Sequence, residues 1–552
     1  MRKRKLAAHP GMPIAQVRKA VALVELHNKQ VANLARFWKL LRRTIETDTE
    51  RSPWLSMRQK TPLPDSKKAR AAPAIYMAWR DDIHQSWEAP TLLMDATMSA
   101  EIVSQFFPTA NVAHRIPAPM PHTYVRQIID RAMTGDMLIP VGAPNDHADS
   151  RRWANVERAR HFILVRADDV APGQMLVVCQ QGLELALLGG PLPDTVDIAH
   201  FNAITGLNAW KDVAVVIVIG RTAPPVRDVE RIARVLFGAE VQEVEPDEKG
   251  YIRYPQTRRG IRMRNGRGIA VDGPHHPDPR AEAIRWAICE GELVQAIGRG
   301  RGVNRTEANP LQIDILTNVC VPIQVDEITA WKKIQPGTAH IMRARDAVPL
   351  SYADMATAYP DLFPSREAAK KTIGREAENW GQTPSKEEYL IGICPQFSYQ
   401  RYRRRGAPGP AGVLLYDPTR IEPKNWLTEH LGEVVLLASE GEEIEAGKSD
   451  ELPASASPSF VEHRIREVDF APQAPASAEL IRCAFGTIDT AWPAPTIDPA
   501  WWQDLFEERA AHREFDGGYP RREAERLAWE ECLVEWRRQH AGQGHPIWAA
   551  LF

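Results

Sequence analysis

The chain has 552 residues, a formal net charge of −2 and an apolar content of 44%, which is typical of globular proteins. This length leaves room for roughly three or four domains of ordinary size. The near-neutral charge excludes a uniformly basic protein, so any nucleic-acid site must be a local patch. The basic N-terminal sequence MRKRK precedes no apolar segment, and no run of about 18 apolar residues occurs. We therefore expect a cytoplasmic protein without a membrane partner.

The six cysteines lie far apart in the sequence, without a C-x-x-C pair and without a histidine at metal-binding spacing. Paired spacing would be the sign of a zinc site or a disulfide framework. Its absence argues for free thiols in a reducing compartment, and we expect no metal site.

Apolar residues recur at helical spacing over 12–46 and predict one long helix. Further along, the run Leu92–Met94 predicts a short buried strand, which is followed by Asp95 and Thr97. A helix is predicted over Ala100–Phe107. An acid and a hydroxyl at the carboxyl end of a buried strand suit a ligand crevice in an α/β sheet. A plain junction between a strand and a capped helix is the alternative.

Predicted strands and helices alternate between residues 120 and 330, which indicates an α/β fold with a parallel sheet covered on both faces. The predicted strands are His122–Ile129, Met175–Cys179, Thr195–His200, Val213–Ile219 and, as the closing strand, Gln312–Leu316. Helices are predicted at Pro225–Phe237 and from Pro279 onward. The dipeptide Asn265-Gly266 between two short runs predicts a β-hairpin rich in arginine.

The segment Glu290–Thr306, with the sequence EGELVQAIGRGRGVNRT, begins with helical apolar spacing and ends in glycines alternating with arginines. Glycine lets the backbone come close to a partner, and the planar arginine fork matches phosphate oxygens. The segment therefore predicts a phosphate-binding loop, and we call its end rich in glycine and arginine, Gly298–Arg305, the Gly-Arg loop. A solvated basic loop is the alternative.

Four segments resemble, in the right order, motifs of the superfamily 2 helicases with their paired RecA-like domains. They are LLMDAT at Leu92–Thr97, QMLVVC at Gln174–Cys179, HFNAITGLNAWKDVAVVIVIGR at His200–Arg221, and ELVQAIGRGRG at Glu292–Gly302. The resemblance covers about residues 75–330 and is nearest to primase/helicase-type proteins of bacterial plasmids and prophages. It implies that 1–115 holds a helical remnant and the end of a first RecA-like domain, and that 116–335 is a second one.

The resemblance also implies roles for individual residues. Gln295 and Arg299 match the Q-x-x-G-R motif, whose arginines reach the γ-phosphate of ATP. The position of the final arginine holds Gly302, which leaves Arg301 and Arg305 as alternative second fingers. The implied catalytic residues are Gln295, Arg299 and Arg301. The implied nucleotide-binding residues are Gly206, Asn208, Asp212, Gln295, Arg299 and Arg305, and those coupled to nucleic acid are Asp95 and Thr97.

A helicase needs a phosphate loop and an acid for Mg²⁺, and the chain has no G-x-x-x-x-G-K-[ST] sequence. The string GEEIEAGKS has the wrong spacing, and Asp326-Glu327 follows the arginine motif instead of preceding it. We therefore expect ATP and Mg²⁺ to bind only if a partner chain or a missing N-terminal half supplies the phosphate loop. Alone, the chain should not hydrolyse ATP.

Residues 340–435 resemble a winged helix-turn-helix domain. A short helix capped by Ser351 precedes a second helix and then a basic hairpin around a Gly/Pro turn. The residues expected to bind DNA are Lys370, Lys371 and Arg375 on the second helix, with Arg401, Arg403, Arg404 and Arg405 on the hairpin. The alternative is a small helical domain with a solvated hairpin.

The composition of residues 440–477 predicts a flexible linker, and 478–552 is predicted to be a helical C-terminal domain. Two functions follow. The first is a split or truncated component of a DNA helicase or nucleic-acid-dependent ATPase in mobile-element replication. The second is a non-catalytic DNA-binding protein of plasmid or phage replication control, with a degenerate RecA-like scaffold.

Overall fold

The computed structural model divides the chain into two compact units, Met1–Ser455 and Ala456–Phe552. It describes residues 14–47, 52–62, 71–84, 89–116, 118–142, 149–204, 206, 208–238, 240–380, 385–406 and 410–437. The predicted linker at 440–477 and the predicted helical domain at 478–552 lie outside these residues. None of the helices in the described ranges is long and apolar enough to cross a bilayer.

A six-stranded sheet with the order β11-β3-β9-β6-β4-β5 forms the centre of the first unit, and all its neighbouring strands are parallel. Its strands are β3 (Thr123–Ile128), β4 (Met175–Cys179), β5 (Val196–His200), β6 (Val215–Ile219), β9 (Leu311–Leu316) and β11 (Glu327–Thr329). Every residue of β4 and β6 is buried, because layers cover both faces. The predicted α/β fold is confirmed. The predicted closing strand, β9, lies inside the sheet instead.

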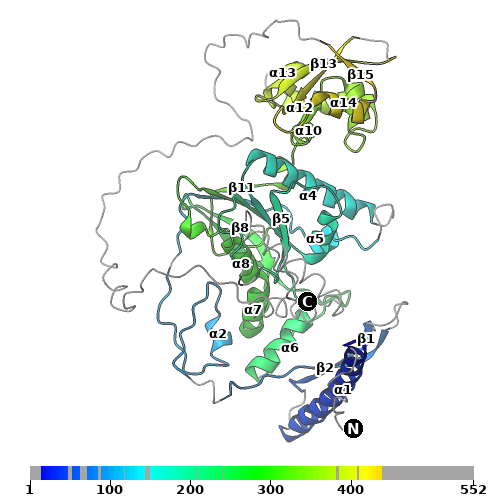
Figure 1. The fold of residues 1–552 in the computed structure, drawn as a ribbon. Helices are drawn as coiled ribbons and strands as arrows, with labels where there is room; N and C mark the ends of the chain where they lie inside the picture. The colour runs from blue at the N-terminus through cyan, green and yellow to red at the C-terminus, as the bar shows by residue number, and fades with distance from the viewer. Residues whose placement is uncertain are drawn as a thin grey trace, which may run out of the picture. The chain divides into compact units, whose positions relative to one another are not determined.

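The two faces of the sheet have different covers (Figure 1). On one face pack α4 (Ser150–Asp169), α5 (Gln181–Leu188) and the short α9 (Trp331–Ile334). On the other pack α8 (Glu292–Gly298) and the hairpin of β7 (Gln256–Met263) and β8 (Gly268–Pro274). Gly266 turns this hairpin with a φ of +83°, so the predicted turn is confirmed. The two-residue strand β10 (Gln324–Val325) adds to the free edge of β7.

Two further groups of elements pack around this body. Helix α6 (Val226–Phe237) contacts α7 (Pro279–Trp286) through an apolar cluster that includes Val229, Ala233 and Ala281. At the N-terminal side, α1 (Ile14–Glu46) confirms the long predicted helix. It is followed in the chain by the antiparallel pair of β1 (Leu55–Pro62) and β2 (Ala71–Met77).

The prediction of a buried strand at Leu92–Met94 is wrong. These residues form no strand, and the exposed fractions of Leu92 and Met94 are 79% and 85%. A buried strand needs hydrogen-bonded neighbours, and the described sheets offer it none. The helix after it, α2 (Ala100–Val103), is shorter than predicted, although Ser99 caps it as expected.

A second, smaller sheet has the antiparallel order β12-β14-β13-β15. The elements of this region are α10 (Thr338–Arg343), β12 (Ala347–Pro349), α11 (Tyr352–Ala358), α12 (Arg366–Trp380), α13 (Lys386–Gly392), β13 (Ser398–Arg404), β14 (Gly412–Tyr416), α14 (Pro423–Leu431) and β15 (Val434–Leu436). It has its own core, which includes Phe363, Ile373 and Leu427. The predicted succession of a capped helix, a second helix and a hairpin is confirmed.

Candidate functional site

The Gly-Arg loop lies at the amino edge of the parallel sheet. It joins α8 to the start of β9, while residues 201–214 lead into the start of β6. Because β6 and β9 are adjacent and parallel, both loops meet at the same edge. This geometry brings together segments that are far apart in the sequence.

Side chains from three of the four helicase-like segments make hydrogen bonds along α8 and the Gly-Arg loop. Gln295 Nε2 donates to Thr97 Oγ1 at 3.0 Å, across 198 residues of sequence. Arg299 Nη2 in turn donates to Gln295 Oε1 at 3.3 Å. Arg301 donates to Asn208 Oδ1. The fourth segment forms the buried strand β4 and serves as sheet core.

Asp95 shapes the turn that presents Thr97. Its Oδ1 accepts hydrogen bonds from the Thr97 amide at 2.5 Å and from the Thr97 hydroxyl at 2.9 Å. Both residues lie on an irregular segment and not at the end of a strand, so the predicted strand-end crevice is absent at this position. Outside this turn, the Thr97 hydroxyl accepts the hydrogen bond from Gln295 that connects it to α8.

Arg305 holds the loop in shape. Its side chain is buried, and its guanidinium donates to the Gly300 carbonyl at 2.8 and 2.6 Å and to Asn309 Oδ1 at 2.8 Å. Asn309 Nδ2 lies 3.5 Å from Asp212 Oδ1, which ties the loop to the segment before β6. Burial lowers the pKa of Arg305, although the Asp212 carboxylate opposes this. Arg305 and Asp212 therefore serve the loop itself.

Arg301 adopts an unusual backbone conformation. Its φ of +50° lies in the left-handed region, which costs a residue other than glycine roughly 1 kcal/mol. Burial lowers the pKa of Arg299, as does the neighbouring Arg301, while Glu292 opposes the shift. Two neighbouring cations in a half-buried setting repel each other, so an anion that binds beside them is attracted by both.

Two glycines of the loop, Gly300 and Gly302, pack closely against the protein's own side chains, whereas Gly298 has open space around it. A Cβ on Gly300 would lie 2.8 Å from Leu311 Cδ2 and 2.9 Å from Val216 Cγ2. On Gly302 it would lie 2.8 Å from Met120 Cγ. These glycines let the loop sit tightly on the sheet, while Gly206, with a φ of +78°, makes the turn before Asn208.

The helix that carries Gln295 and Arg299 contains a π-helical turn at Ala287–Gly291, between α7 and α8. The Thr222 hydroxyl, from the loop after β6, donates to the Ile288 carbonyl within this turn. Such single π turns occur frequently at functional sites. Here the turn sets the orientation of α8, and hence of Arg299, relative to α7.

A buried set of ion pairs anchors this helix. We call Arg259, Glu282, Arg285 and Glu290 the α7 ion network. Arg285, 1% exposed, lies 2.6 Å from a carboxylate oxygen of Glu282 and 2.6 Å from one of Glu290. Arg259 of the hairpin lies 2.5 Å from Glu282 and 3.0 Å from Glu290. Sequence reasoning missed this network, although acids at 282 and 290 around Arg285 in a buried helix were a usable signal.

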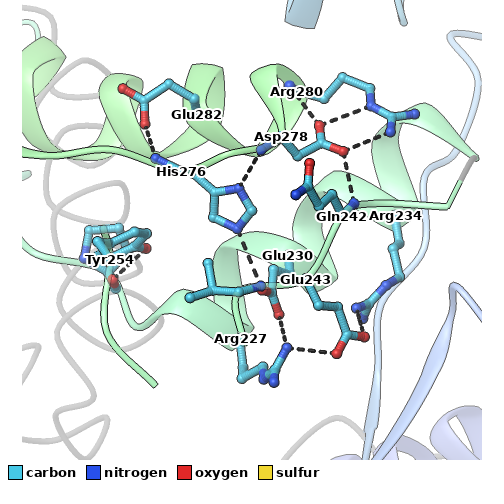
Figure 2. Close-up of polar contacts among 12 residues, drawn as sticks. Arg227, Glu230, Arg234, Gln242, Glu243, Tyr254, His276, Asp278, Arg280 and Glu282 are labelled. Carbon is cyan, nitrogen blue, oxygen red and sulfur yellow. Dashed lines mark hydrogen bonds and ion pairs between the residues drawn. The ribbon is translucent and has the colours of Figure 1, made fainter. Parts of the chain in front are cut away.

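Glu282 of the α7 ion network is also connected to α6, through His276 (Figure 2). The His276 amide donates to Glu282 Oε2 at 2.8 Å, and its imidazole Nε2 lies 3.5 Å from Glu230 Oε1. Burial acts to raise the pKa of Glu230, but hydrogen bonds from His276, the Val244 amide and Arg227 outweigh it and lower the pKa. Asp278 caps α7 by accepting from the Arg280 amide at 2.9 Å. These polar groups hold α6 and α7 together.

The predicted DNA-binding residues of the smaller region fall into two groups. Lys370, Lys371 and Arg375 are exposed on α12, whose opposite side is buried. Arg401 and Arg403 are likewise exposed, on the outer side of β13. In contrast, Arg404 pairs with Asp354 at 3.0 Å and Arg405 pairs with Glu433 at 2.8 Å.

Asp326 and Glu327 hold the edge of the sheet. Asp326 accepts from the Val125 amide at 2.8 Å and pairs with Arg264, while Glu327 accepts from the Tyr124 hydroxyl at 2.7 Å. Within the described ranges, no group of three or more His, Cys, Asp or Glu side chains could hold a metal ion. Comparisons with protein-family models, with curated proteins and with solved structures found no match to this chain.

Proposed function

We propose that the chain is one part of a DNA helicase or nucleic-acid-dependent ATPase of a mobile-element replication system. In this proposal the six-stranded sheet is the second RecA-like domain, and another chain or half supplies the phosphate loop, with ATP and Mg²⁺. The hydrogen bond between Thr97 and Gln295, which also contacts Arg299, carries the proposal. This contact joins two of the resembling segments across 198 residues of sequence.

Arg299 and Arg301 are the residues that we propose for the γ-phosphate. Arg305 is a poor candidate because its guanidinium already binds Gly300 and Asn309 inside the protein. Arg301 is favoured because its side chain is kept at a left-handed position where glycine would be less strained. Residues held in such conformations cluster at functional sites.

The exposed run Leu92–Met94 supports a missing half. Its sequence is that of a buried strand, yet the exposed fractions of Leu92, Leu93 and Met94 are 79%, 41% and 85%. It directly precedes Asp95, which shapes the turn to Thr97. A segment of this kind fits the last strand of a first RecA-like domain whose other strands come from the partner.

The region of the smaller sheet supports a role in DNA binding. The elements α10, β12, α11, α12, α13, β13 and β14 follow one another with the sheet order β12-β14-β13, which resembles a winged helix with α13 as an additional helix between α12 and the hairpin. The exposed Lys370, Lys371 and Arg375 on α12 then face the duplex. On the wing, Arg401 and Arg403 reach phosphates, whereas Arg404 and Arg405 maintain its shape.

ATP hydrolysis with single-stranded DNA tests the proposal, using the full chain alone and together with the product of the adjacent upstream reading frame. We expect hydrolysis only in the mixture. Arg299→Ala should lower it about 10³-fold, as the loss of an arginine finger does. Arg42→Ala, which removes an exposed arginine of α1, should leave it unchanged.

The alternative is a DNA-binding protein without ATPase activity, which the missing phosphate loop and the exposed cations of α12 favour. No hydrolysis in any mixture, together with salt-sensitive DNA binding, would support it. In that case Lys370→Ala/Lys371→Ala should weaken DNA binding, while Arg299→Ala should not.

A further inference from the structure

A cavity of about 850 Å³ lies at the carboxyl edge of the sheet, at the end opposite to the Gly-Arg loop. It is bordered by α3 (Gly135–Leu138), which follows β3, by the first turns of α4, and by α9, which follows β11. Such a volume is typical of ligand sites in proteins. None of the residues in the helicase-like segments lines it.

The cavity is strongly basic. Among the described residues, its charged lining consists of one carboxylate, Asp136, and the five cations Arg131, Arg151, Arg152, Arg158 and Lys332. Like charges brought close together destabilise a fold, so packing gives no reason to gather them here. Because the cations come from three separate elements, the fold itself assembles the cluster.

Three of the five cations lack a counterion within the described residues. No described carboxylate lies within ion-pair distance of Arg151, Arg158 or Lys332, and all three are exposed. Arg152 is oriented by Asp149 Oδ1 at 2.6 Å and by the Asp136 carbonyl at 2.9 Å. Arg158 donates to Asn155 Oδ1 at 2.8 Å, which holds the guanidinium while leaving its charge uncompensated.

The orientation of α4 adds to the positive potential. Arg151 and Arg152 occupy the first turn of this 20-residue helix, where the helix dipole disfavours cations. Asp149 stands at the N-cap position, yet its carboxylate accepts from the amides of Val141 and Gly142 and not from the first turn of α4. The positive end of the α4 dipole therefore adds to the potential of the cavity.

We propose that this basic cavity is a second site for a multiply phosphorylated ligand, separate from the Gly-Arg loop. Arginine and lysine around a helix N-terminus match phosphate oxygens. The described lining offers cations for phosphates and no aromatic ring for stacking on a base. The phosphates belong to the backbone of a single-stranded nucleic acid or to a free polyphosphate.

The test uses the full chain and two probes, inorganic triphosphate by calorimetry and a fluorescent single-stranded oligonucleotide by anisotropy. Both are measured in the Lys370→Ala/Lys371→Ala background, which removes binding at α12. Adding Arg151→Ala/Lys332→Ala should weaken, by about tenfold, the binding of whichever probe the site accepts. The slope of log K against log salt concentration should fall by the equivalent of about two phosphate contacts. Lys333→Ala is the matched control, because Lys333 is exposed next to Lys332 and does not line the cavity.

Loss of triphosphate binding would assign the site to free polyphosphates, and loss of oligonucleotide binding alone would assign it to a strand backbone. Unchanged binding of both probes by the double variant would overturn the proposal, as would an equal loss in Lys333→Ala. Arg151→Lys/Lys332→Arg keeps the charges and should retain the salt dependence. An unchanged unfolding midpoint shows that the variants remain folded.

Discussion

Two regions of the molecule, the α7 ion network and the Gly-Arg loop, use arginine in opposite ways. In the α7 ion network, Arg259 and Arg285 face carboxylate oxygens at 2.5 to 3.0 Å in a buried setting. In the Gly-Arg loop, about a dozen residues further on, Arg299 and Arg301 donate to the side-chain amides of Gln295 and Asn208. An amide orients a guanidinium without neutralising it, although the nearby Glu292 carboxylate also attracts Arg299.

This difference separates scaffold from site. A buried charge surrounded by counterions contributes to the fold, and its removal leaves other charges unpaired. A guanidinium that is oriented by amides retains most of its attraction for an anion from outside. Variants of the two regions should therefore differ in kind: the first should lose stability, and the second should lose function at constant stability.

The largest effect is expected for Arg285→Ala. This change leaves Glu282 and Glu290 buried without their main counterion, which should lower the free energy of unfolding by about 3–5 kcal/mol. Urea unfolding followed by circular dichroism measures it. Arg267→Ala, at an exposed position of the hairpin turn, should change the value by less than about 0.5 kcal/mol. A loss below about 1 kcal/mol in Arg285→Ala would mean that the network is not a scaffold.

Arg305→Ala should have the next largest effect, about 2 kcal/mol. The change removes charged hydrogen bonds to the Gly300 carbonyl and leaves that buried carbonyl without this donor. Amide hydrogen exchange at Gly300 and Asn309 should become faster. If amide exchange in the loop stays slow and the free energy of unfolding is unchanged, Arg305 does not hold the loop. Arg305 would then again be a candidate for the second arginine finger.

Lowering the pH should weaken the α7 ion network. Burial acts to raise the pKa of Glu282, but hydrogen bonds from Arg285 and from the His276 amide outweigh it and lower the pKa to about 2. Since the unfolded value is about 4.3, the stabilisation is complete above that pH and is lost as the pH falls towards 2. In urea unfolding between pH 6 and 3, Glu282→Gln should show a flatter pH dependence. An equal slope in both proteins would contradict this assignment.

Much of the fold follows from local patterns in the sequence. Continuous apolar runs located β4 and β6, and Asn265-Gly266 located the hairpin. The same kind of pattern was misleading at Leu92–Met94, because an apolar run forms a strand only where neighbours complete its hydrogen bonds. Local propensity cannot tell whether those neighbours belong to the same chain.

The site was predictable in part. The spacing of Gln295 and Arg299 was visible in the sequence, whereas the difference between Arg301 and Arg305 depends on a backbone angle and on contacts with Gly300 and Asn309. The basic cavity was missed because its cations come from segments near 131, 151–158 and 332. Only the parallel order of β3 and β11 brings these segments together.

The smallest change in stability is expected for Arg301→Gly, and it gives the sharpest contrast between the two regions. Relief of the left-handed conformation gains about 1 kcal/mol, and the greater freedom of glycine in the unfolded chain costs about 0.5–1 kcal/mol. The net change in urea unfolding should be within about 0.5 kcal/mol. Arg301→Ala also loses the guanidinium but keeps the strain, so it should be less stable than Arg301→Gly.

Both variants of Arg301 should lose the hydrolysis that the partner mixture supports, because both lack the second cation for the γ-phosphate. A loss of stability above about 2 kcal/mol in Arg301→Gly would instead make the contact with Asn208 structural. The Gly-Arg loop would then be a second scaffold of the same kind as the α7 ion network, and Arg299 would be the remaining candidate for the finger.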